Sequence, residues 1–122
     1  MANLLEETRT KLKDNNKLET DVLWCGSEEY GWFSWAKFNK LANKDYDASF
    51  GSPKVCTDLL VVGKDWWLER HEYDGSEWWE YKARPKKPRK QAAPVVIVDN
   101  SFMWQSLAES NRPGGKYGEE DS

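Results

Sequence analysis

His71 is the only histidine in the chain and the residue best suited by type to nucleophilic or acid–base chemistry. A serine or cysteine nucleophile needs a neighbouring base, so a Ser-His or Cys-His system would have to use His71. Strand alternation places Glu69 and Trp78 beside it, which is typical of a solvated strand position. We therefore expect no catalytic residues and no enzyme activity.

The remaining chemistry-bearing residues predict neither a metal site nor a cofactor site. Cys25 and Cys56 lie in separate segments without C-x-x-C spacing, so we expect buried free thiols of a reducing compartment. Paired carboxylates such as Glu28-Glu29 lie in turn or tail composition, where they serve solubility. The sequence contains no H-E-x-x-H, P-loop, G-x-G-x-x-G or EF-hand pattern.

A tryptophan-rich hairpin is the clearest structural signal. Residues 66–73 and 76–83 flank Asp74-Gly75, which favours a two-residue turn, although a three-residue loop would shift the cross-strand register by one residue. With the two-residue turn, one face is predicted to pack on the helix that contains Trp35 and Phe38. That face carries Trp66, Leu68, Arg70, Trp79, Tyr81 and Ala83.

The opposite face of the hairpin mixes aromatic rings with acidic groups, and we call it the acidic aromatic face. This composition suits a protein-contacting surface, and the alternative is a charged solvent face with incidental tryptophan. Glu69 falls opposite Glu80, a repulsion that Lys82, Arg70 or a cationic partner group would relieve. The predicted partner-binding residues are Trp67, Glu69, His71, Tyr73, Trp78 and Glu80.

Residues 82–90, the basic segment, concentrate positive charge in an otherwise acidic chain. Removing its six charges takes the formal net charge from −3 to −9. Such a segment can neutralise phosphates, or it can be a solvated linker whose charges prevent collapse. Its candidate nucleic-acid contacts are Lys82, Arg84, Lys86, Lys87, Arg89 and Lys90.

The elements that position these residues are short. Helical periodicity predicts a helix over 4–17 capped by Asn3, and a second beginning after Ser34, with Trp35, Phe38, Leu41 and Ala42 on its apolar stripe. Strands are predicted over 20–25, 58–62 and the hairpin, with a ring-pinned loop over 44–53. The fold class is α+β: a small antiparallel sheet whose Trp-rich hairpin packs against one or two helices, with an extended C-terminal tail.

Composition divides the chain after the hairpin. We expect an α+β domain over 1–84, a basic Pro-rich linker over 85–94, a short strand and helix over 95–110, and a disordered tail over 111–122. Pro94 to Val98 form the strand-like run, and Phe102, Met103, Trp104 and Leu107 belong to the predicted helix. The start of the chain has no long apolar region, so we expect no membrane contact and a cytoplasmic location.

The stretch WWLERHEYDGSEWWEYK at 66–82 resembles a family of small uncharacterised proteins of bacteriophages and bacterial mobile elements. The likeness extends through DVLWCGS at 21–27, the Trp35 helix, SFG at 49–51 and DLLVVG at 58–63. The resemblance assigns no functional residues. It implies a host-takeover or anti-defence context, in which small proteins occupy a site on a larger machine, as anti-CRISPR proteins do.

These observations predict a non-enzymatic accessory protein that binds a host protein in the bacterial cytoplasm, with a nucleic-acid-guided defence system as one target. A nucleic-acid-binding module is the first alternative, in which the basic segment contacts phosphates and exposed tryptophans stack on bases. A virion or assembly component is the second. The oligomeric state and the identity of the partner are not encoded in any recognisable pattern.

Overall fold

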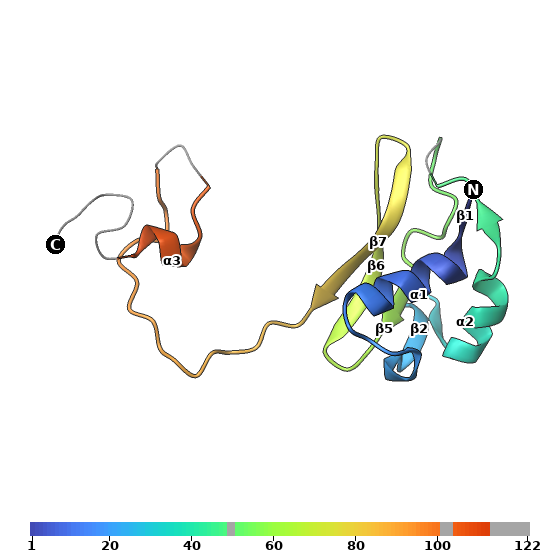
Figure 1. Cartoon of the computed structure of the whole chain (residues 1–122), viewed down its shortest axis with the longest axis horizontal. Coiled ribbons are helices and arrows are strands. Elements are labelled where there is room, and N and C mark those ends of the chain that lie inside the picture. The colour runs from blue at the N-terminus through green and yellow to red at the C-terminus, as the bar shows by residue number, and fades with distance from the viewer. Residues whose placement is uncertain (49–50, 101–103, 113–122) are drawn as a thin grey trace. The chain divides into compact units, whose positions relative to one another are not determined.

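A five-stranded antiparallel sheet in the order β3-β2-β5-β6-β7 forms the centre of the fold (Figure 1). The computed structural model describes residues 1–48, 51–100 and 104–112, and divides into units of residues 1–85 and 86–122. The predicted α+β class is confirmed. The strands of this sheet are β2 (Trp24–Ser27), β3 (Gly31–Phe33), β5 (Leu60–Val62), β6 (Trp66–Tyr73) and β7 (Ser76–Ala83).

The hairpin β6–β7 has the register that a two-residue turn predicts. Glu69 pairs with Glu80 and His71 with Trp78, and the two turn residues have positive φ values of 50° at Asp74 and 87° at Gly75. Such a turn matches the twist of the flanking strands, and glycine adopts its second position without a steric penalty. The alternation of the two faces follows directly from this register.

Helix α1 (Leu4–Asp14) begins where the sequence predicts and ends three residues earlier. The Asn3 side chain caps it by accepting a hydrogen bond from the Glu6 N–H at 3.1 Å. Asn16 adopts φ 59°, and the Lys17 N–H turns back to the Leu12 carbonyl at 2.8 Å, which closes the helix. The predicted stripe is confirmed, since Leu5, Thr8 and Leu12 are buried.

Helix α2 (Trp35–Ala42) is capped by Ser34, whose hydroxyl accepts from the Lys37 N–H at 3.1 Å. Phe38 and Ala42 are buried, and the Trp35 ring stacks on Phe38 with centroids 5.1 Å apart. Leu41 departs from the predicted stripe because it is 60% exposed, on the flank of the helix that faces an apolar hollow.

The strand predicted over 20–25 begins later than expected, at Trp24. Residues Glu19–Asp21 form a 3₁₀ turn, in which the Asp21 carboxylate accepts the Leu18 N–H at 2.7 Å. The strand β2 begins at Trp24 and forms a hairpin with β3, where no strand was predicted. Gly26 is required there, because a Cβ at its φ of 138° would lie 2.1 Å from the Gly31 carbonyl oxygen.

The loop predicted over 44–53 contains a short strand, β4 (Asp45–Tyr46), which pairs with β1 (Ala2–Asn3). Two-residue strands have no periodicity, so sequence patterns do not reveal them. Of the two rings predicted to pin this loop, Tyr46 is anchored by hydrogen bonds, and Phe50 lies outside the described residues. The strand predicted over 58–62 is confirmed as central, although it begins at Leu60.

The inner face of the hairpin packs under α1 rather than under α2. The Trp79 indole N–H donates to the buried Thr8 hydroxyl at 2.8 Å, whereas α2 contacts the sheet at β2. The helix that contacts the hairpin most is therefore α1 rather than the predicted α2, although Phe38 of α2 belongs to the same buried cluster as Trp79. Cys25 is buried as expected, but Cys56 is exposed because it lies in the loop before β5.

Within its described residues, the second unit contains one short helix, α3 (Leu107–Ser110), capped by Ser106. The strand predicted at 95–98 is wrong, since the Asn111 side chain holds the Val95 and Val96 N–H groups at 2.8 and 2.9 Å in a loop. Trp104 is fully exposed and outside the helix. Phe102 and Met103 lie outside the described residues.

Candidate functional site

The outer face of the sheet carries the predicted partner-binding residues. The strand register aligns them in rows across five strands, and Figure 1 shows α1 and α2 on the other side of the sheet. Aligned side chains in one row share a face. One row contains Trp32, Gly26, Leu60, Glu69 and Glu80, and the next contains Trp24, Val62, Trp67 and Lys82.

This face has an apolar part on β3, β2 and β5 and an acidic part on β6 and β7. Trp32 is 73% exposed and Tyr73 at the hairpin tip is 76% exposed, whereas Trp67 and Trp78 are half-buried. Large exposed rings on a sheet are costly to leave in water, so they favour an interaction surface. The β3 part was missed, because no strand was predicted at residues 31–33.

Glu69 lies at the centre of the acidic aromatic face with both carboxylate oxygens engaged. Its Oε1 accepts from the Trp67 indole at 2.6 Å, and its Oε2 lies 2.7 Å from His71 Nε2. The hydrogen bond with His71, followed by that from Trp67, lowers the pKa of Glu69. The carboxylate is therefore ionised at neutral pH and fixes the orientation of both rings.

Glu80 forms the matching contact on β7. Its Oε2 accepts from the Trp78 indole at 2.8 Å, and this bond is the main cause of its lowered pKa. Two ionised carboxylates thus face each other across the hairpin, flanked by two indoles. The expectation that Arg70 offsets this repulsion is wrong, since Arg70 points to the opposite face.

Arg70 belongs to a buried polar network under α1 that the sequence did not reveal. Its side chain is only 3% exposed, and its guanidinium donates to Glu77 Oε1 at 2.9 Å and lies 3.4 Å from Glu7 Oε2. It also donates to the Tyr46 hydroxyl at 3.1 Å, and that hydroxyl donates to Glu7. Burial, then the bond to Glu7, raises the pKa of Tyr46 to about 12.

Glu77 extends this network to the loop before β5. Its carboxylate accepts the Lys54 N–H at 2.6 Å and the Val55 N–H at 3.2 Å. Burial would raise the pKa of Glu77, but these N–H groups and Arg70 outweigh it, so the pKa lies below its ordinary value. The network therefore fixes residues 54–55 against the sheet.

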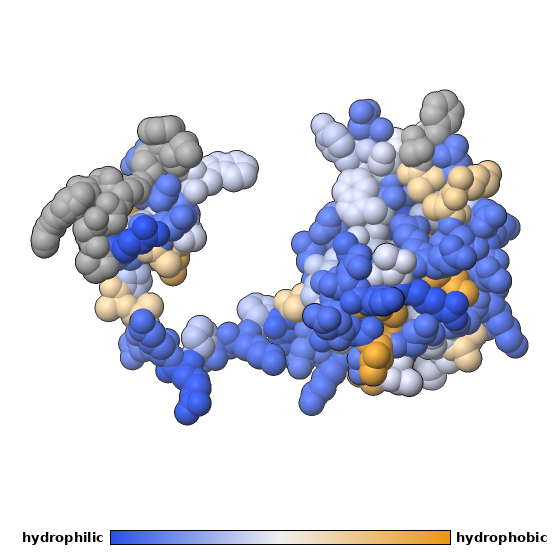
Figure 2. Space-filling model, in the orientation of Figure 1, coloured by the Kyte–Doolittle hydropathy of each residue, from blue (hydrophilic) through white to orange (hydrophobic). Residues whose placement is uncertain are grey.

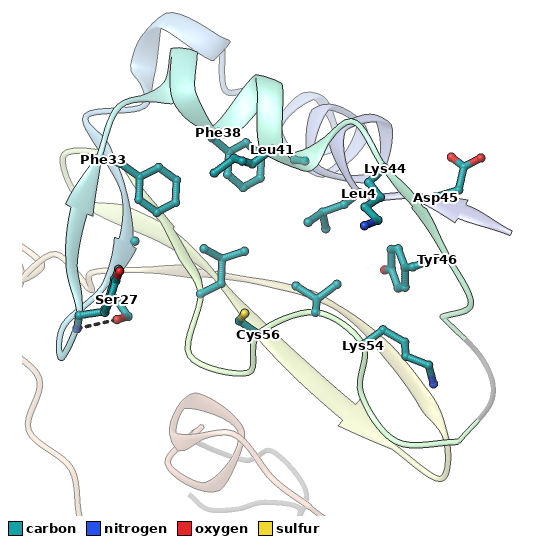
Figure 3. Close-up of a pocket in the computed structure, with 15 residues that line it drawn as sticks. Leu4, Ser27, Phe33, Phe38, Leu41, Lys44, Asp45, Tyr46, Lys54 and Cys56 are labelled. Carbon is teal, nitrogen blue, oxygen red and sulfur yellow. Dashed lines mark hydrogen bonds between the residues drawn. The ribbon is translucent and has the colours of Figure 1, made fainter.

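A hollow of about 510 Å³ lies between this loop and the helices (Figure 3). Its walls are mainly apolar and include Leu4, Phe38, Leu41, Val55 and Leu59. The polar residues Lys44, Lys54 and Tyr46 also line it. The sequence could not predict the hollow, because its walls come from segments separated by dozens of residues.

The structure places the six charges of the basic segment on exposed residues. Lys82 and Arg84 belong to the first unit, and Lys86, Lys87, Arg89 and Lys90 to the second. Residues 84–88 form neither helix nor strand, and this stretch is hydrophilic along its length (Figure 2). Its charged side chains are therefore open to solvent.

The described residues offer little reactive chemistry. Among them, no three His, Cys, Asp or Glu side chains gather closely enough to hold a metal ion. Burial raises the pKa of the Cys25 thiol to about 12, so it is protonated at neutral pH and a poor nucleophile. Within the same ranges, no helix combines the length and apolar character needed to cross a bilayer.

Comparisons of the chain with protein-family models, with curated proteins and with solved structures found no match. The likeness to small phage and mobile-element proteins therefore stays a prediction.

Proposed function

We propose that this chain is a non-enzymatic binding protein whose acidic aromatic face holds a basic segment of a partner protein. The observation that carries the proposal is the pair Glu69 and Glu80. Both carboxylates have lowered pKa values, both are oriented by indole donors, and the described helices of the first unit lie on the other side of the sheet.

The arrangement suits a cationic side chain for three reasons. An ammonium or guanidinium group between the carboxylates would relieve their mutual repulsion, and the adjacent indole faces would add cation–π attraction. The rings of Trp67 and Trp78 are already fixed by hydrogen bonds, so less conformational entropy is lost on binding. Tryptophans of this kind commonly anchor protein interfaces.

In the phage or mobile-element context that the resemblance implies, the partner is a host protein of the bacterial cytoplasm. A nucleic-acid-guided defence nuclease presents basic surface where it holds nucleic acid, which complements this acidic face. Inhibition by occupying such a surface is the activity that we propose. It requires no cofactor and no catalytic residue.

The test compares tagged variants in affinity capture from a host lysate, followed by binding measurements with the captured protein. Glu69→Lys combined with Trp78→Ala is expected to weaken binding at least about tenfold, because it removes a carboxylate and an anchoring ring. Glu72→Lys on the same strand, exposed on the other face, is the matched control. Equal binding by the double variant and the control would refute the proposal.

A second candidate function rests on the six exposed charges of the basic segment, which could contact nucleic acid directly. Changing Lys86, Lys87, Arg89 and Lys90 to Ala should leave protein capture intact if the acidic aromatic face is the binding surface. Tight, salt-sensitive binding of wild-type protein to DNA or RNA in a gel-shift assay, lost in that variant, would favour the second candidate instead.

A further inference from the structure

The hollow beneath α2 is apolar, and its walls are held in place from outside. One wall, at residues 54–55, is fixed by the Glu77 carboxylate, which accepts both backbone N–H groups. Another, at Tyr46, is fixed by Arg70 and by the pairing of β4 with β1. These contacts do not depend on side chains meeting across the hollow, so the space does not need to collapse for the walls to be stable.

A preformed space of about 510 Å³ is within the range of small-molecule sites and exceeds what one apolar side chain fills. Leu41, an aliphatic residue on the flank of α2, lies at the edge of the hollow and is 60% exposed. An apolar occupant would remove this surface from water. Tyr30, also at the hollow, is 92% exposed.

The charge beside the hollow indicates the polar end of that occupant. Figure 3 shows the Lys44 side chain extending from the end of α2, with its ammonium between Leu4 and Tyr46 and directed toward the hollow. Among the described residues, this ammonium has no hydrogen bond or ion pair. Asp45, the one acidic residue among the described residues of the lining, instead accepts a hydrogen bond from the Asn3 side chain at 3.0 Å.

We propose that this hollow binds an amphipathic carboxylate, a molecule with an aliphatic chain and one anionic end. The chain lies along Phe38, Leu41, Val55 and Leu59, and the carboxylate pairs with Lys44. This site lies on the opposite side of the sheet from the acidic aromatic face and is independent of the function proposed for that face.

Dodecanoate, below its micellar concentration, is a suitable probe in isothermal titration calorimetry with the full chain. We expect one molecule bound per chain, with dodecanol weaker and dodecyltrimethylammonium weakest. Leu41→Gln should weaken dodecanoate at least about fivefold by removing apolar wall. The control Leu18→Gln changes a leucine of similar exposure, 67%, outside the hollow and should bind as wild type does.

Lys44→Gln tests the polar end separately. It should weaken dodecanoate about two- to fivefold, the effect of an exposed ion pair, and leave dodecanol unchanged. Lys40→Gln, in the last turn of α2 and outside the lining, should change neither. Stronger binding of the alkylammonium, or equal effects of Leu41→Gln and Leu18→Gln, would overturn the proposal. Absence of dodecanoate binding would also overturn the proposal. If Leu41→Gln then abolished protein capture, the hollow would instead be a binding site for apolar side chains of a partner protein.

Discussion

At the scale of residues, the buried pair of Arg70 and Glu77 is the interaction on which the inner face depends most. Both side chains are less than 5% exposed, so removing one leaves the other charge without its closest partner. The same carboxylate holds the loop at residues 54–55. Substitution of Glu77 should therefore affect both the stability of the sheet and the shape of the hollow.

Glu77→Gln is expected to lower the free energy of unfolding by about 3 kcal/mol at neutral pH, because Arg70 loses its charged partner. The folded-state pKa of Glu77 is depressed below its ordinary value of 4.5. Its ionic contribution is therefore complete above that value and disappears as pH falls through the folded pKa. Urea unfolding at several pH values should show the gap between wild type and variant narrowing only on the acid side of 4.5.

The exposed Glu72, which pairs with Glu77 across the hairpin, supplies the control. Glu72→Gln should change stability by no more than about 0.5 kcal/mol, as surface substitutions do. An equal loss in the two variants, or a gap that stays constant down to pH 3, would contradict the assigned role of Glu77.

This network also marks a limit of sequence reasoning at single residues. Alternation correctly assigned Arg70 to the inner face, but its partners Glu7 and Tyr46 are 63 and 24 residues away along the chain. No local pattern reports such long-range pairs. The contacts of Glu69 with Trp67 and His71 are different, because residues two apart on a strand share a face and could be predicted from spacing.

At the scale of elements, the strand β7 separates two tryptophans that are adjacent in sequence. Trp79 is 2% exposed and bonded to Thr8, while Trp78 is half-buried on the outer face. Trp79→Ala should cost about 3–5 kcal/mol through the cavity it leaves, and Trp78→Ala about 1 kcal/mol. Urea unfolding measures both. Equal losses would show that the faces of the hairpin are assigned wrongly.

Elements with a strong local signal could be predicted, and those defined by distant partners could not. The hairpin, its turn and both helix caps follow from residue type and spacing, so their positions agree with expectation. The strand expected at 95–98 fails because β-branched residues need a neighbouring strand, and here Asn111 provides the hydrogen-bond partner for Val95 and Val96. The pairing of β1 with β4 leaves no sequence pattern at all.

At the scale of the whole molecule, the buried apolar residues that the structure describes all lie within residues 1–85. A core forms from Leu5, Leu12, Cys25, Phe38, Ala42, Val61, Trp66, Leu68 and Trp79. The second unit has the opposite character, with Val95, Ile97 and Trp104 each more than 80% exposed. The first unit therefore contains both the buried core that stabilises the fold and the outer face of the sheet.

A fragment of residues 1–85 should unfold cooperatively in a thermal melt, with a midpoint within a few degrees of the full chain, because it retains every buried side chain of that core. A fragment of residues 1–80 provides the contrast. It loses the last three residue pairs of the hairpin and the stacking of the Tyr81 ring on Trp66, whose ring centroids are 6.0 Å apart. The fragment should therefore unfold at a clearly lower temperature. A non-cooperative melt of the longer fragment would instead mean that residues beyond 85 contribute to the folded core.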